Sequence, residues 1–292
     1  MALLTREGRQ LTDFRYYIPQ QVADNLISVS DGKETFFLDT QGQPAHGVPS
    51  VAGFGTLRWE GSLLKADVDD RVRYLDRNFQ IVWQSDNTMP LAGGLRVIER
   101  KHRANRATLI FSPEFAGLAD SQAQESLNRR LHAEFLGGEL GPPRERVEEP
   151  SATTDFGFSV RQMKGLVIIY ETGYWYGWGA AHGMSSRTYY HVDAKTGALY
   201  TLADLFRKES AFTDRLQAII HQQILANQDK GVNQNPEVKL AQAFYLSADA
   251  LTIYYRPYEI SSYSRGFVEF TIPWSEISDL IDTNGPFWRS FH

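Results

Sequence analysis

Residues Glu171 to Phe206 read ETGYWYGWGAAHGMSSRTYYHVDAKTGALYTLADLF. Aromatic rings, glycines and a histidine crowd the first part of this segment, a mixture that core packing alone does not explain. A strand pattern follows over 188–192, then turn formers from Asp193 to Gly197, then a short strand over 198–200. The segment therefore predicts strands joined by tight turns, with an unusual aromatic stretch before the second strand.

Two other segments have the residue spacing of amphipathic helices. The first begins at Ser121, which forms a capping-box pattern with Gln124, and stops at Gly137-Gly138; its apolar residues recur every four positions, at Ala123, Leu127, Leu131 and Phe135. The second begins near Ser210 and ends at Gly231 and Asn233; its apolar face comprises Phe212, Leu216, Ile219, Ile220 and Ile224. Both helices are expected to pack on sheets.

The remaining patterns are mostly strands. Apolar runs over 108–111, 156–160, 166–170, 251–255 and 267–272 predict strands, and Ser275 is expected to cap a last short helix carrying Ile277, Leu280 and Ile281. The Gly-, Pro- and charge-rich stretch 138–155 predicts a long exposed loop. Because strands and helices do not alternate regularly, we predict an α+β fold with antiparallel sheets and two main amphipathic helices.

Residues 1–106 are β-rich and contain a weak internal repeat at a spacing of 37 residues. Phe37-Leu38-Asp39 aligns with Tyr74-Leu75-Asp76, and the tight turn after each Leu-Asp ends at Gln43 and Gln80. Phe79 stands where the first copy has the turn glycine Gly42. Either two hairpin repeats or a chance likeness within a β-meander explains the pattern. We predict a β-rich accessory domain over 1–106 and an α+β domain over 107–292.

Composition narrows the function classes. A net charge of -5 argues against generic nucleic-acid binding, which needs a basic face. The basic run Arg96, Arg100, Lys101, His102, Arg103, Arg106 could form an anion or nucleic-acid patch, but the acidic balance favours a solvated strand edge. The run Asp67-Val68-Asp69-Asp70 lacks the glycine and distal glutamate of a calcium loop and predicts a solvated hairpin turn. No cofactor fingerprint is present, and the absence of cysteine excludes disulfides and thiolate chemistry.

The sequence does not decide the cellular compartment of the protein. Ala2-Leu3-Leu4 is shorter than the roughly 7–15 apolar residues of a signal-peptide core, and no window reaches the roughly 20 apolar residues of a membrane span. The chain is therefore either cytoplasmic or extracytoplasmic with its export or anchoring segment outside this sequence.

The aromatic stretch is the first candidate binding site. Tyr174, Trp175, Tyr176 and Trp178 could form an exposed platform that stacks on sugars or on side chains of a partner. Alternation along a strand could instead send some of the rings into the core. Four aromatic residues in five positions place rings on both faces of a strand, so at least one face is expected to meet something other than solvent.

His182 and the Tyr258-Glu259 turn are the candidate polar groups. His182 could act as a base or a metal ligand with Glu171, His191, Asp193 or Asp204, but no metal-binding spacing links them. The alternative is a histidine that hydrogen-bonds backbone at a glycine-rich turn, and we assign no catalytic residue and no metal. Glu259 could be a general acid, or could accept backbone hydrogen bonds in the turn after Pro257. Tyr254, Tyr255 and Tyr263 accompany these two residues in an aromatic and polar patch.

Several ordered motifs over about 107–282 resemble a known pair of domains of unknown function. The motifs are Phe111 to Leu118, Gln124 to Leu131, Gly179-Ala180-Ala181-His182-Gly183, His191-Val192-Asp193, Leu202 to Phe206, Phe244-Tyr245-Leu246, Tyr258-Glu259-Ile260 and Phe270 to Pro273. The pair is found in the extracytoplasmic part of the anti-sigma-V factor, which binds lysozyme, and N-terminal to some peptidoglycan deacetylases. That family usually has Gly-Gly-Ala-His where this chain has Gly179-Ala180-Ala181-His182.

The resemblance implies a non-catalytic module of the bacterial cell envelope that recognises a protein or a peptidoglycan-type glycan. The expected binding residues are Tyr174, Trp175, Tyr176, Trp178, His182, Tyr258 and Glu259, with no cofactor. Two alternatives stay open: an envelope glycan-active enzyme that uses His182 or Glu259, and a β-repeat scaffold that mediates assembly. An enzyme would bring ionisable groups from distant segments together in one pocket, and a binder would expose the rings.

Overall fold

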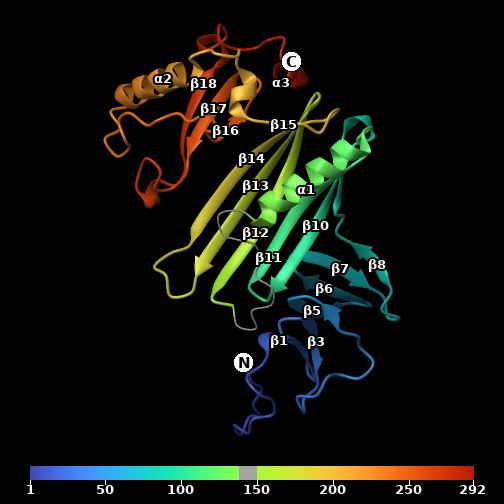
Figure 1. The fold of residues 1–292 in the computed structure, drawn as a ribbon. Coiled ribbons are helices and arrows are strands. Elements are labelled where there is room, and N and C mark those ends of the chain that lie inside the picture. Colours follow the sequence, from blue (N-terminus) through green and yellow to red (C-terminus); the bar gives the residue numbers. More distant parts are fainter. Residues whose placement is uncertain (138–149) are drawn as a thin grey trace. The chain divides into compact units, whose positions relative to one another are not determined.

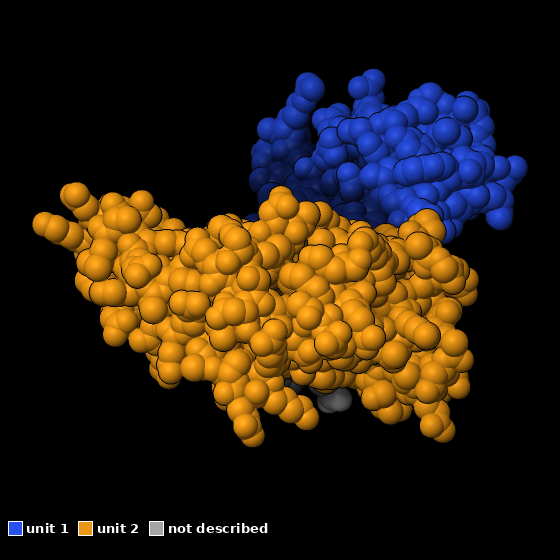
Figure 2. All heavy atoms as spheres, turned by 90° about the horizontal axis from the view of Figure 1, so that it is seen from above, with its two compact units in different colours: residues 1–87, 101–110, 141–155 blue, residues 88–100, 111–140, 156–292 orange. Residues whose placement is uncertain are grey.

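A computed structural model describes residues 1–137 and 150–292 of the chain. The predicted loop over 138–155 therefore lies largely outside the described residues. Contacts divide the chain into two compact units (Figure 2). Unit 1 comprises residues 1–87, 101–110 and 141–155, and unit 2 comprises 88–100, 111–140 and 156–292. The units interleave in sequence, and the boundary near residue 106 stays a prediction about domain organisation.

Unit 1 contains two small antiparallel sheets. The first has the order β1 (Tyr17–Ala23), β2 (Leu26–Ser30), β3 (Glu34–Leu38), β4 (Val51–Ala52). The second has the order β5 (Gly55–Glu60), β6 (Leu63–Val68), β7 (Arg71–Leu75), β8 (Ile81–Gln84). Alternate side chains point into a core that includes Phe37, Leu57, Leu64, Ala66 and Leu75. The predicted β-rich N-terminal region is confirmed.

The 37-residue offset seen in the sequence holds in three dimensions. Strand β7 lies at the offset from β3, and each is preceded by the strand with which it forms a hairpin. The turn residue Phe79 has φ 61°, close to the φ of 77° at its counterpart Gly42. Phe79 takes this left-handed conformation although it is not glycine, and its ring packs near Trp59 at a centroid distance of 6.4 Å.

Unit 2 is built on a sheet of seven strands. Its order is β15 (Leu199–Tyr200), β14 (Met184–Asp193), β13 (Leu166–Gly177), β12 (Ala152–Met163), β11 (Thr108–Ala116), β10 (Arg96–Asn105), β9 (Thr88–Pro90). In this sheet β10, β11 and β12 each have one end in unit 1. Figure 1 shows β10 to β14 as long arrows crossed by α1. The quoted segment forms the β13–β14 hairpin, in register from Leu166 opposite Asp193 to Trp175 opposite Met184. The strands and turns predicted there are confirmed.

Helix α1 (Ser121–Gly137) covers one face of this sheet. It buries Leu127, Leu131 and Phe135 against Val167 and Ile169 of β13, as the four-residue spacing predicts. The predicted capping box is wrong. The Asp120 side chain caps the helix by accepting the backbone N–H groups of Gln122 (2.8 Å) and Ala123 (3.1 Å), and the Gln124 amide oxygen instead accepts the N–H groups of Gly117 and Leu118.

The opposite face of β13 belongs to the larger core of unit 2. Leu166 and Ile168 pack there with helix α2 (Phe212–Ala226), helix α3 (Pro286–Phe291) and the sheet β16 (Phe244–Leu246), β17 (Ala250–Tyr255), β18 (Val268–Pro273). Helix α2 buries all five predicted apolar residues but ends at Ala226, before the predicted stop. Only the 3₁₀ turn η4 (Trp274–Glu276) forms near Ser275, and the sequence pattern missed α3.

Three further 3₁₀ turns complete the described elements: η1 (Ala92–Gly94), η2 (Leu202–Leu205) and η3 (Tyr263–Arg265). The described residues contain no helix that is long and apolar enough to cross a membrane. The architecture is α+β with antiparallel sheets, as predicted.

Candidate functional site

The aromatic stretch ends strand β13 and turns back into β14. Gly179 has φ 90°, and the turn is closed by a hydrogen bond from the Ala180 N–H to the Gly177 carbonyl (2.9 Å). The Tyr176 hydroxyl donates to the Ala180 carbonyl at 3.2 Å. The Trp175 ring lies against Gly177, where an added Cβ would come within 2.9 Å of the ring. Glycines here make room for the rings beside the backbone.

Gly183 allows a second close approach. A Cβ at this position would lie 2.3 Å from the Tyr174 ring and hydroxyl and 2.7 Å from the Trp175 carbonyl oxygen. Real Cβ contacts are never that short, so Tyr174 could not cover this position if it carried a side chain. The glycine-rich pattern of the sequence therefore has a packing cause, because the Tyr174 side chain lies over the Gly183 backbone.

His182 links the β13–β14 turn to a segment 76 residues away. Its Nδ1 lies 3.0 Å from the Gly183 carbonyl oxygen and its Nε2 lies 3.1 Å from the Tyr258 hydroxyl. Its ring stacks on Tyr263 at a centroid distance of 4.0 Å, and the Tyr263 hydroxyl donates to the Gly183 carbonyl (2.6 Å). Since a carbonyl only accepts, the arrangement suits a hydrogen on Nδ1 and an Nε2 that accepts from Tyr258. Both ring nitrogens are engaged, which matches the structural alternative for His182.

The Tyr258 turn lies beside a hollow of about 480 Å³. Tyr258 has φ 70°, and the Glu259 carboxylate accepts the Arg256 N–H at 2.8 Å. This contact is the backbone-accepting role that the sequence offered as one alternative for Glu259. The hollow is lined by Lys239, Ala241, Gln242, Ala243, Arg256, Pro257, Tyr258 and Glu259.

Three rings of this region are exposed. Tyr174 is 43% exposed, Trp178 45% and Tyr258 57%, and we call these three residues the aromatic surface. Trp175 and Tyr176 are half-buried. As the alternation of side chains along a strand predicts, some of these rings face solvent and others pack against the protein. Tyr254 and Tyr255, grouped with Tyr258 on sequence, lie in the core instead.

The acidic and histidine residues near His182 in the sequence do not gather around it. His191 is buried in the core and stacks on Phe244 at a centroid distance of 4.3 Å. Asp193 accepts the backbone N–H groups of its own turn, and Asp204 caps η2 through Thr201. Within the described ranges, no group of three or more histidine and acidic side chains could hold a metal ion.

Glu171 is the most perturbed carboxyl of this region. It lies buried on the α1 face of the sheet and accepts the Tyr190 hydroxyl at 3.0 Å. Burial raises the pKa of Glu171 to about 7, although the hydrogen bonds from Tyr190 and Thr188 act in the opposite direction. Neither His182 nor Tyr258 contacts it. Sequence reasoning gave no special role to Gly183 or Arg256, and none to Lys239, which only the tertiary fold brings into the hollow beside Tyr258.

Comparison with known proteins found one family model that matches part of this region. The family model described as a protein of unknown function, DUF3298, matches residues 203–275. Residues 203–275 are therefore similar to a DUF3298 domain. The matched residues include α2, β16, β17 and the Tyr258 turn. The match confirms the expected domain of unknown function.

Two solved structures of DUF3298 proteins are similar to the chain. One, from Bacteroides fragilis, is 18% identical, covers 71% of this chain and 99% of its own, and has a TM-score of 0.50. The other, from Pseudomonas aeruginosa, is 20% identical, covers 65% of this chain and 94% of its own, and has a TM-score of 0.47. The first likeness concerns the fold alone. A search of curated proteins gave no match.

Proposed function

We propose that unit 2 is a non-catalytic binding module of the bacterial cell envelope that recognises a wall glycan through the aromatic surface. The observation that carries the proposal is the meeting of two distant turns, in which His182 fixes Tyr258 beside the β13–β14 turn. Tyr174, Trp178 and Tyr258 all stay exposed there. Exposed rings set on an ordered backbone are typical of sites that stack on flat, weakly polar ligands.

The polar groups beside Tyr258 favour a glycan over a purely apolar ligand. Lys239, Arg256 and Glu259 line the hollow next to the Tyr258 ring. A sugar ring offers one apolar face for stacking and hydroxyl groups at its edge for hydrogen bonds, so ring and polar groups would engage it together. The resemblance to the deacetylase-associated domains points to the same ligand class. A protein partner, as in the anti-sigma-V factor, is the other outcome of the test.

Catalysis at His182 or Glu259 has less support. Both nitrogens of His182 already have partners, and Glu259 accepts a backbone N–H of its own turn. We therefore assign these two residues to shaping the surface. An extracytoplasmic location is part of the proposal, because a wall ligand would be met only outside the cytoplasm.

The test is a calorimetric titration of the full chain with soluble peptidoglycan fragments, beside a Trp178→Ala, Tyr258→Ala double variant. We expect saturable binding to the unsubstituted chain and at least a tenfold loss in the double variant, because aromatic anchors dominate such contacts. Trp83→Ala is the matched control, since Trp83 is 53% exposed but lies in unit 1. Circular dichroism would verify that each variant is folded.

Two results would overturn the glycan proposal. One is equal binding of the fragments to the double variant and to the unsubstituted chain. The other is no binding of fragments by either chain. In that second case, a parallel titration with lysozyme decides whether the surface recognises a protein instead.

A further inference from the structure

Unit 1 contains a pocket of about 430 Å³ whose walls come from five separate segments of the chain. One wall is the end of strand β10 and the turn that follows it, residues 101–106. The others are Tyr17 at the start of β1, the turn 31–33, the pair Ala52 and Gly53, and Asp69 of the β6–β7 turn. A volume in this range is sufficient for a small organic ligand.

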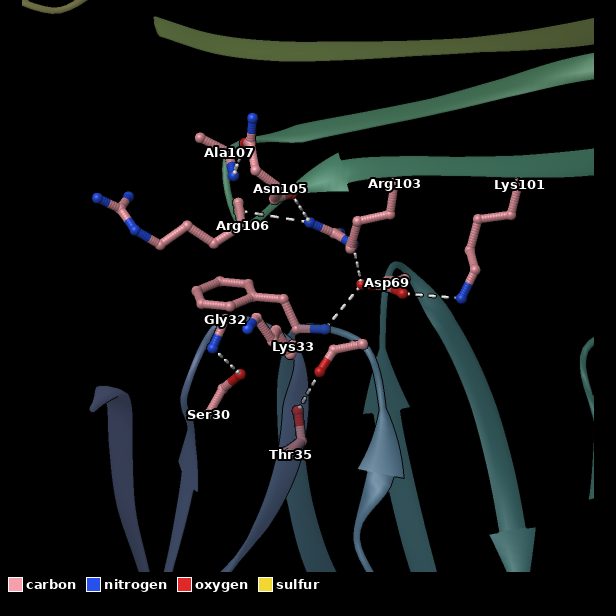
Figure 3. A network of polar contacts seen from close by, with 12 residues as sticks. Ser30, Gly32, Lys33, Thr35, Asp69, Lys101, Arg103, Asn105, Arg106 and Ala107 are labelled. Atoms are coloured by element: carbon pink, nitrogen blue, oxygen red, sulfur yellow. Dashed lines mark hydrogen bonds and ion pairs between the residues drawn. The ribbon is translucent and has the colours of Figure 1, made fainter. Parts of the chain in front are cut away.

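Asp69 organises the cationic side of this pocket. Its side chain is only 1% exposed and accepts the Lys101 ammonium at 2.8 Å, and it also pairs with the Arg103 guanidinium. The Phe54 N–H donates to the same carboxylate at 2.8 Å. Figure 3 shows Lys101 and Arg103 extending from strand β10 toward Asp69. The solvated-turn prediction is wrong for Asp69.

Backbone conformation makes this burial possible. Asp69 and Asp70 both have φ 54°, the conformation of a tight hairpin turn. At Gly53 (φ 116°) a Cβ would lie 2.3 Å from the Asp69 carboxylate, so only glycine leaves space for the side chain. The Gly53 N–H donates to the Lys33 carbonyl at 2.7 Å. The Asp69 carboxylate is therefore held in a fixed place, and it fixes Lys101 and Arg103 in turn.

Two more cations line the pocket. The Arg106 guanidinium lies over the Tyr17 ring, 4.7 Å from its centroid. Lys33 is held through its backbone, whose N–H donates to the Asp31 carboxylate at 2.8 Å, while its ammonium has no partner among the described residues. The Asp31 carboxylate also accepts the Glu34 N–H. Asp31 is thus occupied by backbone groups and not by the pocket cations.

Among the described lining residues of the pocket, cations outnumber carboxylates. The described lining residues include the cations Lys33, Lys101, Arg103 and Arg106 against the carboxylates Asp31 and Asp69. The basic run in the sequence therefore does not form a solvated edge throughout, because the Arg103 side chain is only 14% exposed and faces Asp69. Converging Arg and Lys side chains, beside an aromatic ring, are typical of sites for multiply charged oxyanions.

From this geometry we propose that unit 1 binds a small phosphate-bearing anion in the pocket between residues 31–33, 52–53, 69 and 101–106. Lys33 and Arg106 contact the phosphate oxygens, and Asp69 holds Lys101 and Arg103 in place as positioning partners. The pocket is larger than one phosphate group, so an ester of phosphate with a small organic body fits its volume. This site is separate from the aromatic surface and does not depend on the glycan proposal.

The test measures binding of inorganic phosphate, pyrophosphate and glucose 1-phosphate to the full chain by calorimetry, with glucose as the uncharged control. We expect saturable binding of at least one phosphate compound and none of glucose. A Lys33→Gln, Arg106→Gln double variant should bind at least tenfold more weakly. Arg58→Gln, which removes one positive charge from β5 of the same unit outside the pocket, should change the affinity less than twofold.

Comparing the affinities for inorganic phosphate and for glucose 1-phosphate identifies the kind of phosphate compound that the pocket binds. Tighter binding of glucose 1-phosphate than of inorganic phosphate indicates a phosphate ester, and the reverse indicates the free ion. Lys33→Gln alone guards against misfolding, because the ammonium it removes forms no hydrogen bond or ion pair with a described residue. The proposal fails if no phosphate compound saturates the chain, or if the folded single and double variants bind as tightly as the unsubstituted protein.

Discussion

Asp39 and Asp76 occupy equivalent places in two turns 37 residues apart. The Asp39 carboxylate accepts the N–H groups of Gln41 (2.8 Å) and Gln43 (2.9 Å), and Asp76 accepts those of Asn78 (2.8 Å) and Gln80 (2.9 Å). In both turns the backbone N–H of the aspartate also donates to the carbonyl of the closing glutamine. The repeat therefore extends to individual hydrogen bonds.

This equivalence predicts that removing either carboxylate lowers the free energy of unfolding by a similar amount. Asp39→Ala and Asp76→Ala should each lower the free energy of unfolding by about 1–2 kcal/mol, because each removes the acceptor of two backbone N–H groups. Urea unfolding of the two variants would measure the costs. Asp39→Asn and Asp76→Asn are the matched controls, since the amide oxygen can still accept. Costs that differ between the two alanine variants by more than about 1 kcal/mol would contradict equivalence.

His191 predicts a loss of stability in acid. Burial lowers the pKa of His191 from 6.5 to about 3, and no described residue hydrogen-bonds either ring nitrogen. The unfolded chain therefore binds an extra proton between these pH values, and stability falls as the pH drops from 6.5 toward 3. His191→Phe should remove up to about 5 kcal/mol of this acid dependence, at about 1.4 kcal/mol per pKa unit. Urea midpoints at pH 4, 5 and 6.5 would show whether the variant has a flatter profile; an unchanged profile contradicts the assignment.

The raised pKa of Glu171 predicts the opposite pH dependence of stability: the free energy of unfolding should fall as the pH rises. Its pKa is raised from 4.5 to about 7 by burial, so the folded chain holds an extra proton in this window. Its contribution to stability is fully present below pH 4.5 and is lost as the pH rises through 7. Glu171→Gln should keep an acceptor for Tyr190 and remove a pH-dependent loss of up to about 3 kcal/mol. Unfolding measured at pH 5 and pH 8 tests this, and equal losses in both proteins would refute it.

Replacing Gly183 should cause a structural defect that is confined to the candidate site. Gly183→Ala would force a Cβ to within 2.3 Å of Tyr174, so the ring must move and the backbone that His182 and Tyr263 contact must shift. We expect faster hydrogen exchange over 174–184 and weaker glycan binding, at a cost of about 1–3 kcal/mol. Gly157→Ala is the control, because a Cβ there meets nothing within 4 Å. Unchanged exchange in the Gly183 variant would show that the packing is tolerant.

The alanine at position 180 fits the same turn without strain. In the described backbone the left-handed conformation of this turn falls on Gly179, with φ 90°, and neither Ala180 nor Ala181 has a positive φ. The departure from the Gly-Gly-Ala-His pattern of the resembling family is therefore compatible with the backbone. A Gly179→Ala change should be more disruptive than any change at Ala180, by about 1 kcal/mol, and urea unfolding would compare the two.

Local patterns in the sequence were sufficient to predict several elements. The apolar spacing of α1 and α2 and the strand–turn–strand pattern of 188–200 depend only on neighbouring residues, and they match the structure. The 37-residue spacing was visible for the same reason, since each copy forms its own turn, but the sequence alone did not separate a repeat from a chance likeness. The predictions of the capping residue of α1 and of the end of α2 were wrong, because competing hydrogen bonds decide where a helix begins and ends.

The tertiary structure alone decided where side chains from distant segments meet. His182 reaches Tyr258 and Tyr263 only because the C-terminal sheet packs beside strand β14, and Asp69 reaches Lys101 and Arg103 only because the tip of β10 joins unit 1. No local pattern encodes such pairs, since their partners are set by the path of the whole chain. The sequence by itself determined the helices and the aromatic composition of the turn. It left the repeat open, and the equivalent hydrogen bonds of the two turns decided it. Long-range packing determined which residues are exposed, paired or buried.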